Sequence, residues 1–231
     1  MEKYHFYSYK DFFKKPIRDK IDILKVLVYT LEIILNSNGC DSEKSNITVV
    51  TGRKMQRVFY NYENKIFSIN FPFSIKKVEK NFELFWNDIL VDHVIIATIL
   101  SLIEIDDEGN IKNKEFFEIV MDNIEDKKYE CSFKDDVITA KIIGNSIKIL
   151  KYLLVIEDGY LRYDCDVENY RKAKEKGNIN RHPLHHLDIF YLDDNTFKLG
   201  LDNINASCVN MLIDILNIDT DAYFLDMKYQ W

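Results

Sequence analysis

An α+β fold with a mainly antiparallel C-terminal sheet is predicted by two kinds of hydrophobic spacing. In residues 160–166, Leu161, Tyr163 and Cys165 alternate with polar residues, as in a half-buried strand. In residues 17–35, apolar residues instead recur at the spacing of an amphipathic helix. Helices packed on the apolar face of such a sheet give the α+β class.

The N-terminal half is expected to hold one helix followed by strands. Pro16 suits the first turn of a helix, and Asn38-Gly39 ends its apolar pattern. Strands with β-branched and aromatic content are expected at residues 47–50, 55–62 and 66–73. Glu63-Asn64 is expected to turn the second of these strands into the third, so that they form a hairpin.

The remaining elements are predicted from the same rules. A long apolar segment at residues 82–104 is expected to form the central helix. Two further helices are expected, at residues 113–124 and 206–216. Strands are expected at residues 130–133, 137–143, 147–156 and 223–228. The turn dipeptide Asp158-Gly159 would join residues 153–157 and 160–166 as a hairpin.

Length and composition fit one domain, which admits a subdivision into residues 1–125 and 126–231. The chain has 231 residues, of which 47% are hydrophobic, enough for a sizeable core. A net charge of -7 argues against a protein that coats DNA through bulk charge. There is no continuous apolar leader and no segment long enough to span a bilayer, so we expect no membrane association. Four scattered cysteines without metal-type spacing are typical of the cytoplasm.

A second hairpin is predicted between residues 185–191 and 196–201. A three-residue loop at residues 193–195 would pair Tyr191 with Phe197, Ile189 with Leu199 and Leu187 with Leu201. That register makes one face of the sheet apolar. The opposite face would then collect the ionisable side chains of three strands, which are Arg162, Asp164, Asp166, His186, Asp188 and Lys198.

These side chains are the ingredients of an acid–base or phosphate-handling site, and three interpretations stay open. His186 would act as a general base while Arg162 and Lys198 stabilise a phosphate, without a metal. Alternatively, a divalent ion, Mg²⁺ or Mn²⁺, would activate water; its ligands would be Asp164, Asp166, His186 and Asp188. In the third interpretation the charged face binds a partner and does no chemistry. The alternative to any site is a solvated sheet face with ordinary surface ion pairs. His185, on the other face, is expected to make a hydrogen bond in the core.

A basic segment connects the two strands that carry this site. Residues 169–182 hold five cationic side chains and one acidic one, and we expect them to form a loop that contacts phosphates. The expected nucleic-acid-binding residues are Arg171, Lys172, Lys174, Lys176, Arg181 and, on the sheet, Lys198. Arg181 and His182 would lie at the edge of the site.

Two short patterns resemble known families. Arg162-Tyr163-Asp164, followed by His182-Pro183 and His185-His186, resembles a motif of small uncharacterised bacterial families and of toxins in toxin–antitoxin modules. The order strand–turn–strand–helix after His186 is similar to that of the ββα-metal nucleases, which implies a metal-holding polar residue near the last helix. Candidates for that residue are Asn203, Asn205 and Asn210.

The residues and these resemblances together predict a nuclease-like or toxin-like protein of a bacterial defence system that acts on nucleic acid. The catalytic residues would be Arg162, Asp164, His186 and Asp188. The alternative is a non-catalytic interaction protein, such as an antitoxin, an inhibitor or a sensor of a phage protein, and the acidic net charge favours it. A nucleotide-binding module is a third class.

Overall fold

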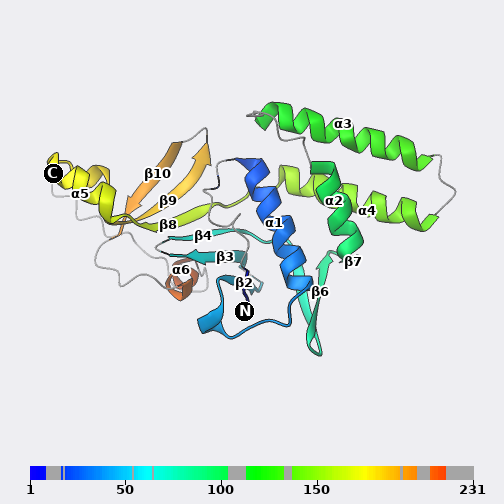
Figure 1. Ribbon diagram of the computed structural model, residues 1–231, viewed down its shortest axis with the longest axis horizontal. Coiled ribbons are helices and arrows are strands. Elements are labelled where there is room, and N and C mark those ends of the chain that lie inside the picture. Colours follow the sequence, from blue (N-terminus) through cyan, green and yellow to red (C-terminus); the bar gives the residue numbers. More distant parts are fainter. Residues whose placement is uncertain are drawn as a thin grey trace.

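A large antiparallel sheet, a smaller sheet and six helices make up the computed structural model (Figure 1). It describes residues 1–8, 17, 19–53, 55–63, 65–103, 113–132, 137–192, 195–201 and 209–216. The large sheet contains β1 (Glu2–Phe6), β2 (Ile47–Thr51), β3 (Gln56–Tyr62), β4 (Lys65–Asn70), β8 (Leu161–Cys165), β9 (His185–Leu192) and β10 (Asn195–Gly200). The small sheet contains β5 (Ser74–Val78), β6 (Asn81–Trp86) and β7 (Ile89–Val91). The predicted α+β class with a large antiparallel sheet is confirmed.

The helices are α1 (Lys20–Leu35), α2 (His93–Ile103), α3 (Asn113–Ser132), α4 (Val137–Val155), α5 (Val167–Glu175) and α6 (Val209–Leu216), with short 3-10 turns η2 (Ser42–Lys44) and η3 (Ile179–Arg181). Helix α1 begins at Lys20 because the Asp19 side chain caps it, accepting the Asp22 backbone N–H at 2.9 Å. The predicted start at Pro16 lies outside the described residues.

The strands of the large sheet lie in the order β1-β2-β3-β4-β8-β9-β10. The last three form the predicted C-terminal meander. They continue the N-terminal sheet, because β8 pairs with β4 and places Arg162 opposite Phe67. This β4–β8 pairing joins the two halves of the chain.

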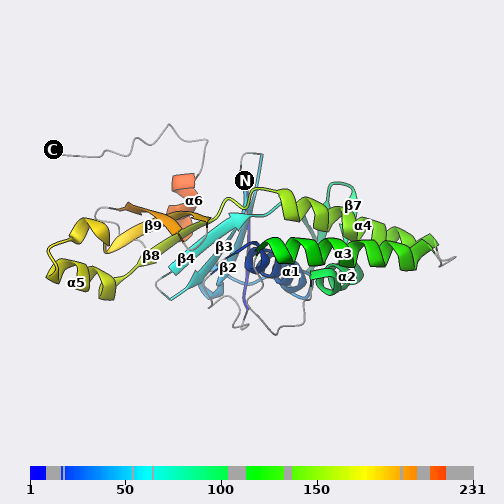
Figure 2. The same cartoon turned by 90° about the horizontal axis from the view of Figure 1, so that it is seen from above.

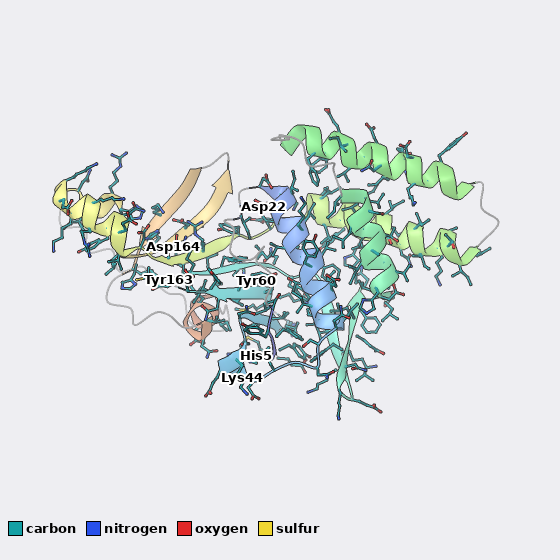
Figure 3. The ribbon with its side chains drawn as sticks, in the orientation of Figure 1. His5, Asp22, Lys44, Tyr60, Tyr163 and Asp164 are labelled. Atoms are coloured by element: carbon teal, nitrogen blue, oxygen red, sulfur yellow. The ribbon has the colours of Figure 1, made fainter. Side chains whose placement is uncertain are left out.

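The two faces of the large sheet are covered by different helices. On one face, Val49, Tyr60 and Phe67 belong to a core that includes residues of α1–α4. On the other, Tyr163 and Leu187 pack with α6. Figure 2 shows α1 and α6 on opposite sides of the sheet, and Figure 3 marks Tyr60 close to α1. Side chains alternate along strands, so Arg162 lies on the α1 face, where β8–β10 extend beyond the four helices (Figure 1).

Several predicted elements are wrong. Residues 82–104 are not one helix: they form β6, a turn in which Asn87 has a φ of 50°, β7 and then α2. The strands predicted at 130–133, 137–143 and 147–156 are instead the end of α3 and the continuous helix α4. For that reason residues 153–157 do not form a hairpin strand with β8. The helix predicted at 113–124 is longer, and the strand predicted at 223–228 lies outside the described residues.

Gly159 sets the turn that leads from α4 into β8. It has a φ of +56°, and a Cβ there would lie 2.7 Å from Asn70 Oδ1. That oxygen already accepts a 2.9 Å hydrogen bond from Arg57, whose guanidinium also donates to the Gly159 carbonyl. The turn is therefore held by contacts that leave no room for a side chain.

We expect Gly159→Ala to lower the free energy of unfolding by about 2 kcal/mol, because it adds a steric clash to the cost of a left-handed backbone. Urea denaturation measures this. Gly177→Ala is the matched control: φ is +69° there but no atom lies within 4 Å of the added Cβ, so only the backbone cost of about 1 kcal/mol remains. Equal losses in the two variants would contradict the role of the Asn70 contact.

Candidate functional site

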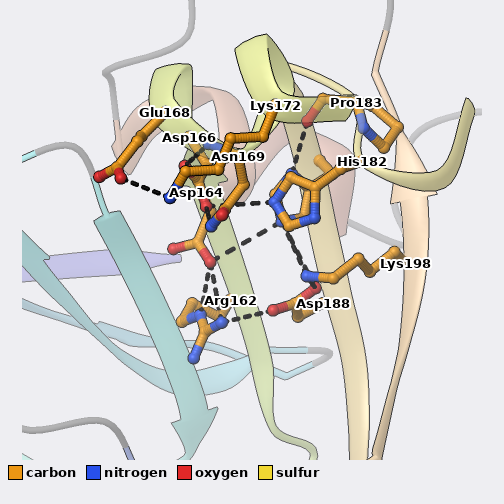
Figure 4. A network of polar contacts seen from close by, with 11 residues as sticks. Arg162, Asp164, Asp166, Glu168, Asn169, Lys172, His182, Pro183, Asp188 and Lys198 are labelled. Carbon is orange, nitrogen blue, oxygen red and sulfur yellow. Dashed lines mark hydrogen bonds and ion pairs between the residues drawn. The ribbon is translucent and has the colours of Figure 1, made fainter. Parts of the chain in front are cut away.

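Five polar residues come together where β8, β9 and β10 lie side by side. The strand register places Arg162 opposite Asp188, and Lys198 opposite Asp188 on its other side. Asp164 lies opposite His186 one step along the sheet. Residues two apart on a strand share a face, so all five project from the α1 face. We call Arg162, Asp164, His186, Asp188 and Lys198 the polar cluster (Figure 4).

Ion pairs link the polar cluster across the strands. Arg162 Nη2 lies 2.8 Å from Asp164 Oδ2 and 2.5 Å from Asp188 Oδ2. Lys198 Nζ lies 2.7 Å from Asp188 Oδ1. Each oxygen of Asp188 therefore contacts a different cation. Two cations and two carboxylates balance the formal charge.

The centre of the polar cluster is buried, which argues against the alternative of a solvated sheet face. His186 and Asp188 are 0% exposed and Asp164 is 5% exposed. The Arg162 and Lys198 side chains are 19% and 29% exposed. Asp164 Oδ1 is buried and accepts no hydrogen bond from the described residues. The accessible part of the cluster is thus cationic, as suits an anionic ligand, and the acidic part lies behind it.

Both ring nitrogens of His186 have partners. Nδ1 lies 3.0 Å from the Pro183 carbonyl oxygen and Nε2 lies 3.0 Å from Lys198 Nζ. The carbonyl can only accept and the ammonium can only donate, so the arrangement fits a neutral ring protonated at Nδ1. Burial and then the charge of Lys198 lower the pKa of His186, against the opposing effects of the Pro183 bond and the two carboxylates. To act as a base, Nε2 would first have to lose its contact with Lys198.

The polar cluster contains a donor set suited to a divalent cation. One ligand atom each from Asp164, His186 and Asp188 lie within 4.8 Å of one another. Two carboxylate oxygens and an imidazole nitrogen suit Mn²⁺, and Mg²⁺ with additional water ligands.

Asp166, predicted to be a metal ligand, is not part of this set. Strand β8 ends at Cys165, so two-residue alternation no longer applies to Asp166. Its side chain caps α5 and accepts from the Asn169 backbone at 3.0 Å and from His182 Nε2 at 3.1 Å. The His182 ring in turn lies edge-on to that of His186, with 5.0 Å between centroids. Asp166 therefore links α5 to the polar cluster without joining it.

Asp166→Ala is expected to cost about 1 kcal/mol of stability at pH 7, the usual value of a helix cap. Partial burial raises the pKa of Asp166, but hydrogen bonds from Asn169 and His182 outweigh this and lower it to about 2. A depressed carboxyl pKa contributes stability above its unfolded value of about 4, and this contribution is lost as the pH falls toward 2. Urea denaturation between pH 7 and pH 2 should therefore show the wild type and the variant converging. A constant difference would contradict the role of the charge.

The basic segment is a helix and a 3-10 turn, where the sequence predicted a loop. It joins β8 to β9 as expected, and α5 lies beside the polar cluster (Figure 4). Lys172 pairs with Glu168 at 2.6 Å, one helical turn away. The cationic residues of this segment that were predicted to bind nucleic acid are exposed, namely Arg171, Lys172, Lys174, Lys176 and Arg181, whereas Lys198 on the sheet is partly buried.

The arrangement expected from the ββα-metal nucleases is not found in the described residues. Helix α6 follows β10, but Leu212 and Ile213 pack on the sheet face opposite to His186. Asn210 accepts a 2.9 Å hydrogen bond from Lys3 on the first strand. Asn203 and Asn205 lie outside the described residues. Asn210 is therefore not a partner of His186 at a metal.

Two further residues complete the surroundings. His185 lies on the opposite face, as predicted, with Nδ1 2.8 Å from the Tyr163 hydroxyl. Tyr160 was missed by the sequence reasoning, although it is two residues before Arg162 and shares its alternation. It is 7% exposed; burial raises the pKa of Tyr160, while the charge of Arg162 opposes that shift.

Comparison with the models of known protein families, with curated proteins and with solved structures finds no match for this chain. Among the described residues, no helix is both long and apolar enough to cross a bilayer.

Proposed function

We propose that this chain is a nuclease-like protein that acts on nucleic acid at the polar cluster. The observation that supports the proposal is the convergence of Arg162, Asp188 and Lys198 in one row across three strands, with His186 behind them. Cleavage of a phosphodiester needs positive charge on the phosphate and a means of deprotonating the attacking oxygen. The cluster contains both kinds of group.

The cationic edge of the site would bind the phosphate. Arg162 and Lys198 are the most exposed members of the polar cluster, and the Asp188 carboxylate holds both in place. Arginine suits this role because its planar fork can donate two hydrogen bonds to one phosphate. Two positioned cations at one phosphate would stabilise the additional negative charge of the transition state.

The attacking oxygen can be deprotonated by two routes, and both require Lys198 to move first. In the metal-free route, His186 Nε2 takes the proton of the attacking oxygen while the phosphorus–oxygen bond to the leaving nucleotide breaks and solvent protonates the leaving oxygen. In the metal route, Asp164, His186 and Asp188 would hold Mg²⁺ or Mn²⁺, and a metal ion at this site would supply activation of the attacking water. Lys198 contacts His186 Nε2 and Asp188 Oδ1, so it blocks either route in the structure described.

The exposed cations of α5 and η3 would contact the flanking phosphates. These two elements connect β8 to β9, the strands that carry most of the polar cluster, and binding of each phosphate releases counterions. We expect Lys174→Ala with Lys176→Ala to weaken binding of a labelled oligonucleotide without changing the cleavage rate at saturation. This pair leaves the Lys172–Glu168 contact intact.

The direct test incubates the protein with end-labelled single- and double-stranded RNA and DNA in EDTA, Mg²⁺ or Mn²⁺. We expect cleavage that falls at least ~100-fold in His186→Ala and Asp188→Asn. Asp122→Asn, an exposed carboxylate on α3, is the control that should cleave like the wild type. Absence of cleavage of every substrate in every condition would retire the enzyme proposal, and activity in EDTA would select the metal-free route.

The resemblance of Arg162-Tyr163-Asp164 and His185-His186 to toxin motifs extends this proposal to bacterial defence in the cytoplasm. Cys40 and Cys165 are free thiols, as a reducing compartment would keep them. Induced expression in a bacterial host should lower viability for the wild type and spare cells that express Asp188→Asn at the same level. Equal growth of the two strains would count against a toxin.

A non-catalytic interaction protein is the second candidate, and exposed apolar residues on the α3–α4 pair favour it. Tyr129, Val137 and Ile138 are 69%, 80% and 72% exposed. Apolar groups gathered at the surface are typical of protein-binding sites. A pull-down that yields a stoichiometric protein covering the Arg162 face, from a preparation with no turnover, would favour this candidate over the nuclease.

A further inference from the structure

An ammonium group already lies among the atoms that would bind a metal ion. Lys198 Nζ is 2.7 Å from Asp188 Oδ1 and 3.0 Å from His186 Nε2. The same Asp188 and His186 atoms lie 3.6 Å from each other. A cation in this part of the polar cluster is therefore a feature of the fold, and the cation is supplied by a side chain.

The donor set has spare capacity for a cation. Asp164 Oδ1 is buried and accepts no hydrogen bond from the described residues, so its lone pairs are available without breaking a contact. Buried carboxylate oxygens without partners are costly and call for an explanation such as an ion. It belongs to Asp164, the third member of the donor set, whose other oxygen, Oδ2, lies 3.8 Å from His186 Nε2 and accepts a hydrogen bond from Arg162.

Lys198 is placed so that it can leave. It lies on β10, the last strand of the sheet order, whose described pairing is with β9 alone. Its side chain is 29% exposed, whereas that of Asp188 beneath it is 1% exposed. An unbranched lysine can move its ammonium into water by rotation about side-chain bonds, with no change in the strand. Its departure would open Asp188 Oδ1 and His186 Nε2 together.

Exchange of the cation would also change the charge of the site. The cluster is formally neutral, with Arg162 and Lys198 against Asp164 and Asp188. A divalent ion in place of one ammonium leaves it with a net positive charge, and the displaced lysine stays nearby. Both changes favour a phosphate next to Arg162.

We propose that Lys198 is a built-in counter-cation that a divalent metal ion displaces, so that metal entry and exposure of the site are one event. The use of this exchange in cleavage rests on the proposed nuclease function, but the exchange itself is a binding property. Mn²⁺ is the probe of choice, because an imidazole nitrogen beside two carboxylates suits it better than Mg²⁺.

The first test measures Mn²⁺ binding from the loss of the free-ion signal in electron paramagnetic resonance. Lys198→Met keeps an unbranched side chain, shorter by the terminal ammonium, and removes its charge, so we expect it to bind Mn²⁺ about tenfold or more tightly than the wild type. Lys198→Arg keeps a competing cation and should not gain affinity. Lys148→Met, which alters an exposed lysine on α4, should match the wild type, and Asp188→Asn should lose binding.

The second test uses the wild type alone and does not depend on whether a variant folds. Lysine acetylation followed by mass spectrometry reports the accessibility of each ammonium. We expect Mn²⁺ to raise labelling of Lys198 at least about threefold, since the ammonium moves from contact with Asp188 into water, and to leave Lys172 unchanged. Mn²⁺ binding without a rise at Lys198 would overturn the exchange.

The outcomes separate this proposal from the nuclease function. Failure of Lys198→Met to bind more tightly, or absence of Mn²⁺ binding in every protein, overturns the exchange even if RNA or DNA is cleaved in EDTA. Tighter binding by Lys198→Met together with metal-dependent labelling of Lys198 supports it even if no nucleic acid is cleaved.

Discussion

Replacement of Asp188 by alanine is expected to lower the free energy of unfolding by about 3–5 kcal/mol, the range for breaking a buried ion pair. The Asp188 carboxylate is 0% exposed and contacts Arg162 with one oxygen and Lys198 with the other. Without it, Arg162 keeps Asp164 as its carboxylate partner, Lys198 keeps only its contact with His186, and the two cations repel each other across β9. Urea denaturation at pH 7 measures the loss.

The matched control for this prediction is Asp122→Ala, which removes an exposed carboxylate from α3 and should change stability by no more than about 0.5 kcal/mol. Arg162→Met in the Asp188→Ala background should recover part of the loss, because it removes one of the unpaired cations. A loss below about 1 kcal/mol in Asp188→Ala would mean that the carboxylate is solvated, contrary to the structure.

The second large effect is expected in α4. Asn145→Pro should cost about 3 kcal/mol or more, because proline removes a backbone hydrogen bond and clashes with the preceding turn of a helix. Residue 145 lies in the middle of the continuous helix Val137–Val155. Circular dichroism and urea denaturation should show the loss of helix and of stability.

Gly144, next to Asn145, provides a control substitution that should raise the stability instead of lowering it. Gly144 is helical, and a Cβ there would meet nothing within 4 Å. Gly144→Ala should therefore stabilise the protein by about 0.5–1 kcal/mol. If residues 144–146 were instead a turn between two strands, as the sequence suggested, proline would be tolerated and alanine would bring no gain.

Strands whose faces differ in polarity could be predicted from the sequence. Leu161 and Tyr163 alternate with Arg162 and Asp164, and the structure keeps this alternation. The hairpin of β3 and β4 was likewise predicted, since the two strands pair antiparallel up to Tyr62 opposite Lys65. Successive residues of a strand point to opposite faces, so odd and even positions separate without knowledge of the register. Five of the six polar side chains were therefore placed on the correct face.

The predicted register between β9 and β10 differs from the observed one by two residues. Phe197 pairs with Ile189 and Leu199 with Leu187, because an irregularity between Asn195 and Phe197 shifts the pairing. A β-bulge of this kind has no clear sequence signal. The predicted faces are nevertheless correct, since a shift by two leaves the alternation unchanged. The observed register places Lys198 directly opposite Asp188, where the predicted register placed it opposite Phe190.

The helices were harder to predict where the sequence is rich in β-branched residues. Isoleucines in residues 137–156 suggested strands. The helical spacing was present, however, because Ile143, Ile147, Leu150 and Leu154 follow the four- and three-residue steps of one buried helix face. Residues 82–104 are so hydrophobic overall that the short turn at Asn87-Asp88 was not recognised from the sequence. The burial of His186 could not be predicted, because it depends on how Pro183 and Lys198 pack around it.

The β4–β8 pairing has a consequence for how the chain acquires its structure during synthesis. β8 can pair with β4 only after α2, α3, α4 and the small sheet have been synthesised, because these elements lie between Phe67 and its partner Arg162 in the sequence. Contacts so distant in sequence slow folding. The edge of β4 should thus stay unpaired on the nascent chain until β8 has been made, and the polar cluster cannot be assembled before β10 emerges.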